Sequence, residues 1–154
     1  MRQVPVIMEW LVNAFANSCE YSDHYLDLAT GKHGYYAPMD FPEHQEQVQQ
    51  MDCQPDCFVR MPKLSKEIDR EIKQAFIDSL AEPQLKELLT RALEEDVDFR
   101  KALMEEEYED TRRRWYKYQS DCYADFLKDW FLERGIELVE DDRPGSKNPI
   151  DVNR

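Results

Sequence analysis

The sequence predicts an α+β fold, in which an N-terminal helix and a small antiparallel sheet are followed by a mainly helical C-terminal half. Two observations support this class. Segments that alternate between apolar and polar residues lie before Pro62, whereas apolar residues recur every three or four positions after Ser65. The two halves share no internal repeat, and 154 residues are enough to build one core. We therefore expect a single α+β domain over residues 1–139.

The N-terminal region predicts one amphipathic helix and one hairpin. Within residues 4–17 the apolar side chains follow helical spacing: Ile7, Met8, Leu11, Val12, Phe15 and Ala16. Two strand-like segments come next, residues 25–28 and 35–36. Gly31 lies between them, and glycine adopts the positive φ that a tight hairpin turn needs. These segments therefore predict two antiparallel strands.

The rest of the first half contains a third strand and a segment that could take either of two forms. Residues 40–56 contain five glutamines and few large apolar side chains, so they form either an exposed helix or a long connection. Residues 57–61 then alternate and stop at Pro62, which is typical of an edge strand. This strand would complete a small sheet with the hairpin.

The second half predicts four helices. Ser65 is a suitable N-cap for the first, whose apolar positions are Ile68, Ile72, Ala75, Phe76 and Leu80. Pro83 suits the first turn of the second helix, a break follows at residues 94–98, and residues 99–104 form a short third helix. The longest helix starts near Asp110 and presents one buried stripe, made by Trp115, Tyr118, Cys122, Phe126 and Trp130.

The chain beyond the last helix predicts a short strand and a tail. Gly135 ends the helix, because glycine readily takes the left-handed conformation found just after a helix. Residues 137–139 add a strand. Residues 140–154 hold acidic and polar side chains with too little apolar surface to order themselves, so we expect a flexible tail.

The charge balance narrows the possible partners. Twenty Lys and Arg residues against thirty-three Asp and Glu residues give a net charge of -13, which repels nucleic acid and anionic lipid and favours a basic protein. No apolar run is long enough to span a membrane, and Glu9 interrupts the apolar start, which has no signal-peptide cleavage site. The four cysteines are expected to be reduced thiols. We therefore expect a cytoplasmic protein that does not bind membranes.

Six short motifs resemble a known bacterial family in their order and spacing. They are Leu26-Asp27-x-x-Thr30-Gly31, Phe58-Val59-Arg60-Met61-Pro62, Phe76-Ile77-Asp78-Ser79-Leu80, Phe99-Arg100, Trp115-Tyr116-Lys117-Tyr118 and Trp130-x-x-x-x-Gly135-Ile136. Over residues 7–139 the chain resembles the uncharacterised protein family numbered zero-one-five-eight. The resemblance implies a small cytoplasmic protein and no particular activity. It also implies a basic, glycine-containing stretch before Phe99, where this chain has the acidic residues 94–98.

One alternative hypothesis is a zinc protein or a cryptic enzyme. Cys53, Cys57 and His44 are its candidate ligands or catalytic groups, with Cys19 or His24 as a further ligand, because zinc prefers four thiolate or imidazole donors. A nucleophilic cysteine would likewise need a nearby histidine. No second closely spaced ligand pair is present, and the common catalytic fingerprints are absent from the sequence. We therefore expect neither a cofactor nor catalytic activity.

The principal hypothesis is a protein-binding module. The residues predicted to bind a partner surround the hairpin: Tyr25, Asp27, Tyr35, Tyr36 and Phe41. Exposed aromatic side chains with an acidic rim are typical of interaction hot spots, and the glutamine-rich residues 40–56 would extend the surface. The partner is expected to be a protein, with a basic surface favoured by the net charge. The oligomeric state stays open.

A second alternative is an acidic inhibitor. An immunity protein, an antitoxin or a nucleic-acid mimic carries such a charge in order to cover the basic site of a nuclease or another nucleic-acid-binding protein. Binding by an inhibitor of this kind would depend strongly on salt concentration.

Overall fold

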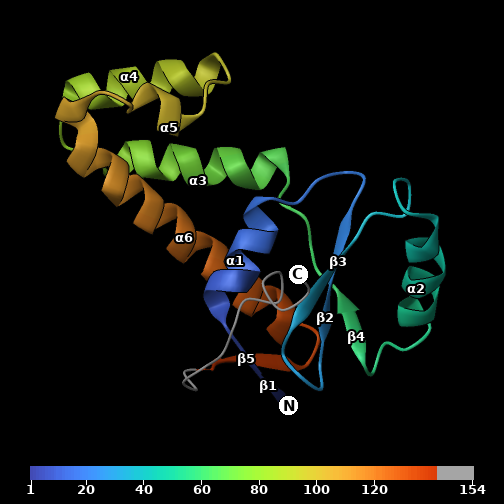
Figure 1. The fold of residues 1–154 in the computed structure, drawn as a ribbon. Coiled ribbons are helices and arrows are strands. Elements are labelled where there is room, and N and C mark those ends of the chain that lie inside the picture. Colours follow the sequence, from blue (N-terminus) through green and yellow to red (C-terminus); the bar gives the residue numbers. More distant parts are fainter. Residues whose placement is uncertain (142–154) are drawn as a thin grey trace. The chain divides into compact units, whose positions relative to one another are not determined.

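The computed structural model describes residues 1–141, which form two compact units (Figure 1). The first unit contains Met1–Lys63 together with the chain from Tyr123 onward, and the second is Leu64–Cys122. All strands belong to the first unit and the second is helical, so the predicted α+β class is confirmed. The single domain over residues 1–139 stays a prediction. The predicted tail, apart from its first two residues, lies outside the described residues.

A parallel strand pair joins distant parts of the first unit. Strand β1 (Arg2–Val6) pairs with β5 (Ile136–Glu140). Val4 and Val6 are buried while the residues between and before them are exposed, which is the two-residue alternation of a strand. The predicted helix over residues 4–17 was therefore wrong at its start, because its first three residues pair with a strand far along the chain. The strand predicted at 137–139 is confirmed, and it includes Glu140, which was assigned to the tail.

Helix α1 (Met8–Ala16) follows β1 directly. Its buried side chains are Leu11, Val12, Ala14 and Phe15. Phe15 packs edge-on against Tyr123, with ring centroids 5.2 Å apart, and stacks on Phe126 at 5.1 Å. These aromatic contacts fix α1 in the core of the first unit.

The second sheet of this unit has three antiparallel strands in the order β3-β2-β4. Strands β2 (Asp23–Asp27) and β3 (His33–Tyr36) form the predicted hairpin, and β4 (Phe58–Arg60) is the predicted third strand. Gly31 has a φ of 75°, as the turn requires. Its N–H donates to the Asp27 carbonyl oxygen at 2.8 Å and closes the turn.

The glutamine-rich segment is a helix, α2 (Pro42–Asp52). Val48 and Met51 are its buried residues, and they pack against Tyr25 of β2. The glutamines face solvent. Two apolar side chains are therefore enough to seat α2 on the sheet, which is why the sequence alone left its structure open.

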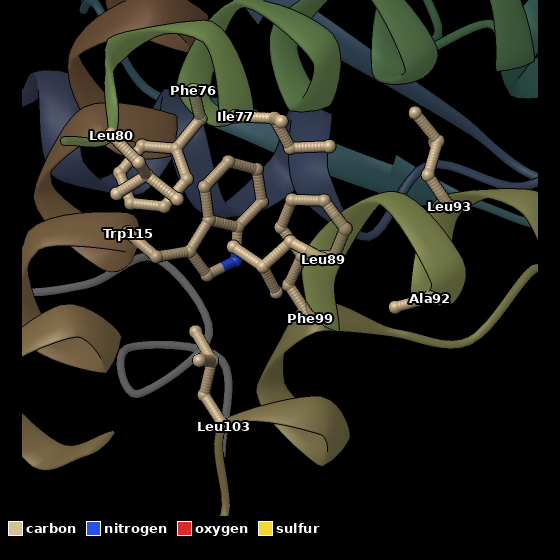
Figure 2. Packing of buried hydrophobic residues seen from close by; sticks show 9 residues of the cluster. All are labelled: Phe76, Ile77, Leu80, Leu89, Ala92, Leu93, Phe99, Leu103 and Trp115. Atoms are coloured by element: carbon tan, nitrogen blue, oxygen red, sulfur yellow. The ribbon is translucent and has the colours of Figure 1, made fainter. Parts of the chain in front are cut away.

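The second unit contains α3 (Lys66–Ser79), α4 (Pro83–Glu94), α5 (Phe99–Ala102), a short 3-10 turn (Glu106–Tyr108) and the first part of α6 (Glu109–Leu132). The Ser65 hydroxyl accepts a hydrogen bond from the Ile68 N–H at 3.1 Å and caps α3 as predicted. Figure 2 shows the core of this unit around Trp115, whose ring lies 5.1 Å from Phe76 and 4.9 Å from Phe99. Each helix contributes to this core, so the unit has its own hydrophobic centre.

Helix α6 buries a stripe that differs from the predicted one. Trp115 is buried as expected, but farther along the buried side chains are Tyr123, Leu127 and Phe131, and Trp130 is only half-buried. Apolar residues stand at both sets of positions, and a spacing of four fits either set. Phe15 contacts one ring from each set, Tyr123 and Phe126, but the buried side chains are those of the second set. No helix within residues 1–141 is long and apolar enough to cross a bilayer.

Candidate functional site

A buried tyrosine ties α2 to the sheet beneath it. The Tyr25 hydroxyl donates a hydrogen bond to Asp52 Oδ1 at 2.8 Å and accepts one from Arg60 Nε at 2.7 Å. Arg60 also donates to Asp52 Oδ2 at 2.8 Å, and its guanidinium lies 5.3 Å from the Tyr25 ring centroid. The three side chains therefore form a closed polar network among β2, α2 and β4.

The network keeps the phenol of Tyr25 protonated. Burial is the main cause, and together with the hydrogen bond to Asp52 it raises the Tyr25 pKa to about 12. Tyr25 is only 2% exposed, so this predicted contact residue is not on the surface. Its role in the structure is to hold α2, and its direct contact with a partner stays a prediction.

The connection from β3 to α2 is a braced turn. The Asp40 and Phe41 N–H groups both donate to the Ala37 carbonyl oxygen, at 3.1 and 2.9 Å. His44 Nδ1 accepts the Ala37 N–H at 3.0 Å, and its ring contacts Phe41 at a centroid distance of 5.0 Å. The imidazole also meets the ring of Tyr36 edge-on, at 5.5 Å. His44, which lies at the start of α2, therefore stabilises the connection between β3 and α2.

Large exposed apolar side chains lie on this braced turn and on β3 just before it. Met39 is 76% exposed, Tyr35 51% and Phe41 47%, and Asp40 and Glu43 beside them are exposed as well. We call these five residues the β3–α2 surface. Exposed apolar groups held on rigid backbone and flanked by charge have the make-up of an interaction site.

Tyr36 and Asp27 were also predicted as contact residues, and both lie outside the β3–α2 surface. Tyr36 is half-buried, and its ring contacts Tyr25 at 5.7 Å. Asp27 shapes the hairpin turn, because its Oδ1 accepts the Ala29 N–H at 2.9 Å. Met39 was missed, although its position between Pro38 and Asp40 is typical of an exposed turn. Of the predicted five, Tyr35 and Phe41 belong to the β3–α2 surface.

Two histidines meet on the face of this sheet that is opposite Tyr25, because neighbouring side chains of a strand point to opposite faces. The rings of His24 and His33 lie 5.4 Å apart, and Tyr35 packs against His24 at the same distance. Burial lowers the pKa of both histidines, that of His33 to about 4. His24 Nδ1 is buried and has no hydrogen-bond partner among the described residues. Both rings are therefore neutral at pH 7.

The candidate metal ligands do not come together. His44 lies in the first turn of α2 and Cys53 caps its other end, nine residues later, which is about 13 Å along a helix. Cys57 is exposed after the following turn, and the Cys19 sulfur contacts the Ser22 hydroxyl at 2.9 Å. Within residues 1–141 no group of three or more His, Cys, Asp or Glu side chains is arranged to hold a metal ion. The part of the chain that the structure describes therefore does not bring Cys53, Cys57 and His44 together as one metal site.

Comparison with known proteins identifies the family. The model of the uncharacterised protein family UPF0158 matches residues 3–152. The chain belongs to UPF0158. The match includes all six motifs, two of which lie at the sites described above: Leu26-Asp27-x-x-Thr30-Gly31 forms the hairpin turn, and the motif from Phe58 contains Arg60 of the polar network. Neither a curated protein nor a solved structure matches this UPF0158 chain.

Proposed function

We propose that this UPF0158 protein is a protein-binding module that contacts a basic partner through the β3–α2 surface. The observation that carries the proposal is the exposure of Met39 and Phe41 on a turn that three hydrogen bonds hold in place, with Tyr35 exposed on β3 just before that turn. Large exposed apolar side chains grouped within one short segment are typical of an interaction site.

The rigidity of the turn supports this function. Because Ala37 and His44 already fix the backbone, little conformational entropy is lost when a partner docks. The polar network around Tyr25 adds to this by holding α2 on the sheet. The surface is therefore ordered before binding.

The charge around the surface supports a basic partner. Residues 20–57 contain eight acidic side chains and one basic side chain, Lys32. A field of this sign speeds the approach of a positively charged surface and repels nucleic acid. The apolar residues would then supply the contact area and the carboxylates the selectivity.

The proposed interaction takes place in the cytoplasm. None of the four cysteines forms a disulfide, although Cys19, Cys53 and Cys57 are exposed. Exposed thiols persist in a reducing compartment. The exposed reduced thiols therefore support a partner in the cytoplasm.

Quantitative affinity purification from the protein's own host tests the proposal. The bait is the full chain, compared with the triple variant Tyr35→Ser, Met39→Ser and Phe41→Ser. A matched control replaces the exposed apolar residues elsewhere: Met104→Ser, Tyr116→Ser and Leu132→Ser. We expect a basic protein that the wild type and the control retain and the first variant loses by about ten-fold or more, since hot-spot truncations each cost at least about 2 kcal/mol.

The same partners at the same levels on all three baits would contradict the proposal. A direct measurement with the purified partner, by calorimetry, then gives the dissociation constant for each variant. Circular dichroism of the three baits checks that each is folded.

A further inference from the structure

The first unit has a second feature, which shares Asp52 and Arg60 with the polar network around Tyr25 but no residue with the β3–α2 surface. A hollow of about 390 Å³ lies where α2 and α6 end. Its apolar lining includes Phe58 and Ile136, and its polar lining includes Asp52, Arg60 and Arg134, with Trp130 beside them. We call it the two-arginine hollow. Its volume is within the range of small-molecule sites.

Arg134 is fixed in position at the rim. Its guanidinium carbon lies 3.4 Å from the centroid of the Trp130 ring, which is a close stacking contact. Its NH1 group donates to the Trp130 carbonyl oxygen at 2.9 Å. The nearest carboxylate contact, to Glu133, is long at 3.8 Å. Since a guanidinium has five N–H donors, Arg134 keeps capacity for a ligand.

Arg60 is held from the other side. Its Nε and NH2 groups are used by Tyr25 and Asp52, so the planar group cannot turn freely. Both guanidinium groups are therefore pre-positioned on the wall of one hollow, in a chain whose net charge is -13. Pre-positioned donors bind an anion with a smaller entropic cost than free side chains do.

The charge of the lining selects the kind of anion. Two arginines and one aspartate leave a single positive charge. The helix ends beside the hollow, Asp52 of α2 and Leu132 of α6, are C-terminal ends, where the helix dipole opposes negative charge. This setting suits a monoanion and disfavours a phosphate dianion. The apolar lining adds a preference for a monoanion that carries a planar hydrocarbon group.

We propose that the two-arginine hollow binds a small carboxylic acid, with its carboxylate on Arg134 and Arg60 and its aromatic or other planar apolar body against Phe58 and Ile136. Arginine suits this ligand because its planar fork matches the two oxygens of a carboxylate. The ring of Trp130 holds Arg134 in the orientation required.

Titration of the isotope-labelled full chain with 3-phenylpropionate tests the proposal. Nuclear magnetic resonance follows the side-chain N–H signals of Arg60 and Arg134 and the indole signal of Trp130. We expect all three signals to shift and saturate with the acid, and the neutral 3-phenylpropionamide to bind at least about ten-fold more weakly, because a charge-assisted hydrogen bond is lost.

Variants assign the site. Arg134→Gln should weaken binding of the acid by about ten-fold or more, and Arg60→Gln should do the same, each with backbone signals that report an intact fold. Arg91→Gln is the control, because Arg91 is an exposed helical arginine paired with Glu87. The proposal is overturned if the amide binds as tightly as the acid, if phenyl phosphate binds more tightly than either, if Arg134→Gln has no effect, or if the acid shifts none of the three signals.

Discussion

The α-carbon of Gly31 lies against the carbonyl oxygen of Pro5, and a Cβ at residue 31 would overlap that oxygen. The hairpin turn and strand β1 are thus in direct backbone contact. Gly31 also has a positive φ, so two separate constraints require glycine at this position.

Replacing Gly31 by alanine should therefore be far more damaging than the same change at Gly135. Gly135 has an equally positive φ of 77°, but an added Cβ meets nothing within 4 Å. We expect Gly135→Ala to cost about 1 kcal/mol of unfolding free energy, from the left-handed conformation alone, and Gly31→Ala to cost at least about 3 kcal/mol. Urea denaturation measures both, and equal losses would show that the contact with Pro5 relaxes easily.

A second pair of variants tests the buried stripe of α6. Phe131 is fully buried, whereas Trp130 is half-buried and packs under Arg134. We expect Phe131→Ala to lower the unfolding free energy by about 3 to 5 kcal/mol through the cavity it leaves, and Trp130→Ala to lower it by less than about 2 kcal/mol. Chemical denaturation decides between them, and the reverse order would place the stripe at the position predicted from sequence spacing.

Removing the Tyr25 hydroxyl from the polar network should lower the free energy of unfolding by a measurable amount. Tyr25→Phe removes the hydroxyl that joins Asp52 and Arg60 but leaves their direct 2.8 Å contact. We expect a loss of about 1 to 2 kcal/mol, with Tyr21→Phe, at an exposed position, as a control that changes nothing. A Tyr25→Phe protein as stable as the wild type in thermal unfolding would mean that the network contributes nothing net.

The two buried histidines make stability depend on pH. The folded-state pKa of His33 is about 4, below the value of about 6.5 in the unfolded chain, so the unfolded state binds protons first as the pH falls. The full contribution is present above about pH 6.5 and is lost progressively toward about pH 4, by an amount on the order of 2 kcal/mol at about pH 5. In His33→Phe the free energy of unfolding should fall less between about pH 7 and pH 5. Parallel pH profiles for both proteins would contradict this assignment.

Charge reversal within the β3–α2 surface should affect binding of the proposed partner more than the same reversal outside it. Asp40→Lys with Glu43→Lys changes the β3–α2 surface, and Glu106→Lys with Glu107→Lys changes the net charge equally without altering that surface. We expect the first pair to slow association by about ten-fold at low salt and the second pair to have a smaller effect, because electrostatic steering is strongest for charges at the contact surface itself. Stopped-flow mixing with the partner measures both rates. Equal slowing would instead indicate an inhibitor that uses its whole acidic field.

Features decided within a few residues could be predicted from the sequence. The hairpin turn at Gly31, the Ser65 cap and the left-handed Gly135 just beyond the end of α6 each depend on local backbone preferences, and the structure has all three. Strand β1 could not be recognised, because Val4 also fits the helical spacing of the residues after it, and the alternation of Val4 with Val6 is too short to predict a strand by itself. Its pairing with β5 is a contact between segments that lie far apart in the sequence.

The candidate sites likewise combine features that depend on neighbouring residues with features that depend on long-range packing. Tyr35 and Phe41 were predicted to contact a partner because they belong to the aromatic cluster around the hairpin, but whether Tyr25 points outward depends on where α2 packs. The two-arginine hollow combines Arg60 with Arg134, which lie far apart in sequence and share no motif. The amino-acid sequence alone therefore does not predict that Arg60 and Arg134 line the same hollow.

The pairing of β1 with β5 sets an order on synthesis. Strand β1 leaves the ribosome before the other described elements, whereas its partner β5 is translated only after all of Leu64–Cys122. That continuous segment has its own core and can fold while translation goes on. During the same interval β1 presents an unpaired edge of N–H and C=O groups, the kind of edge that other strands join. The nascent chain is therefore most exposed to mispairing just before β5 emerges, which is when a chaperone would be of most use.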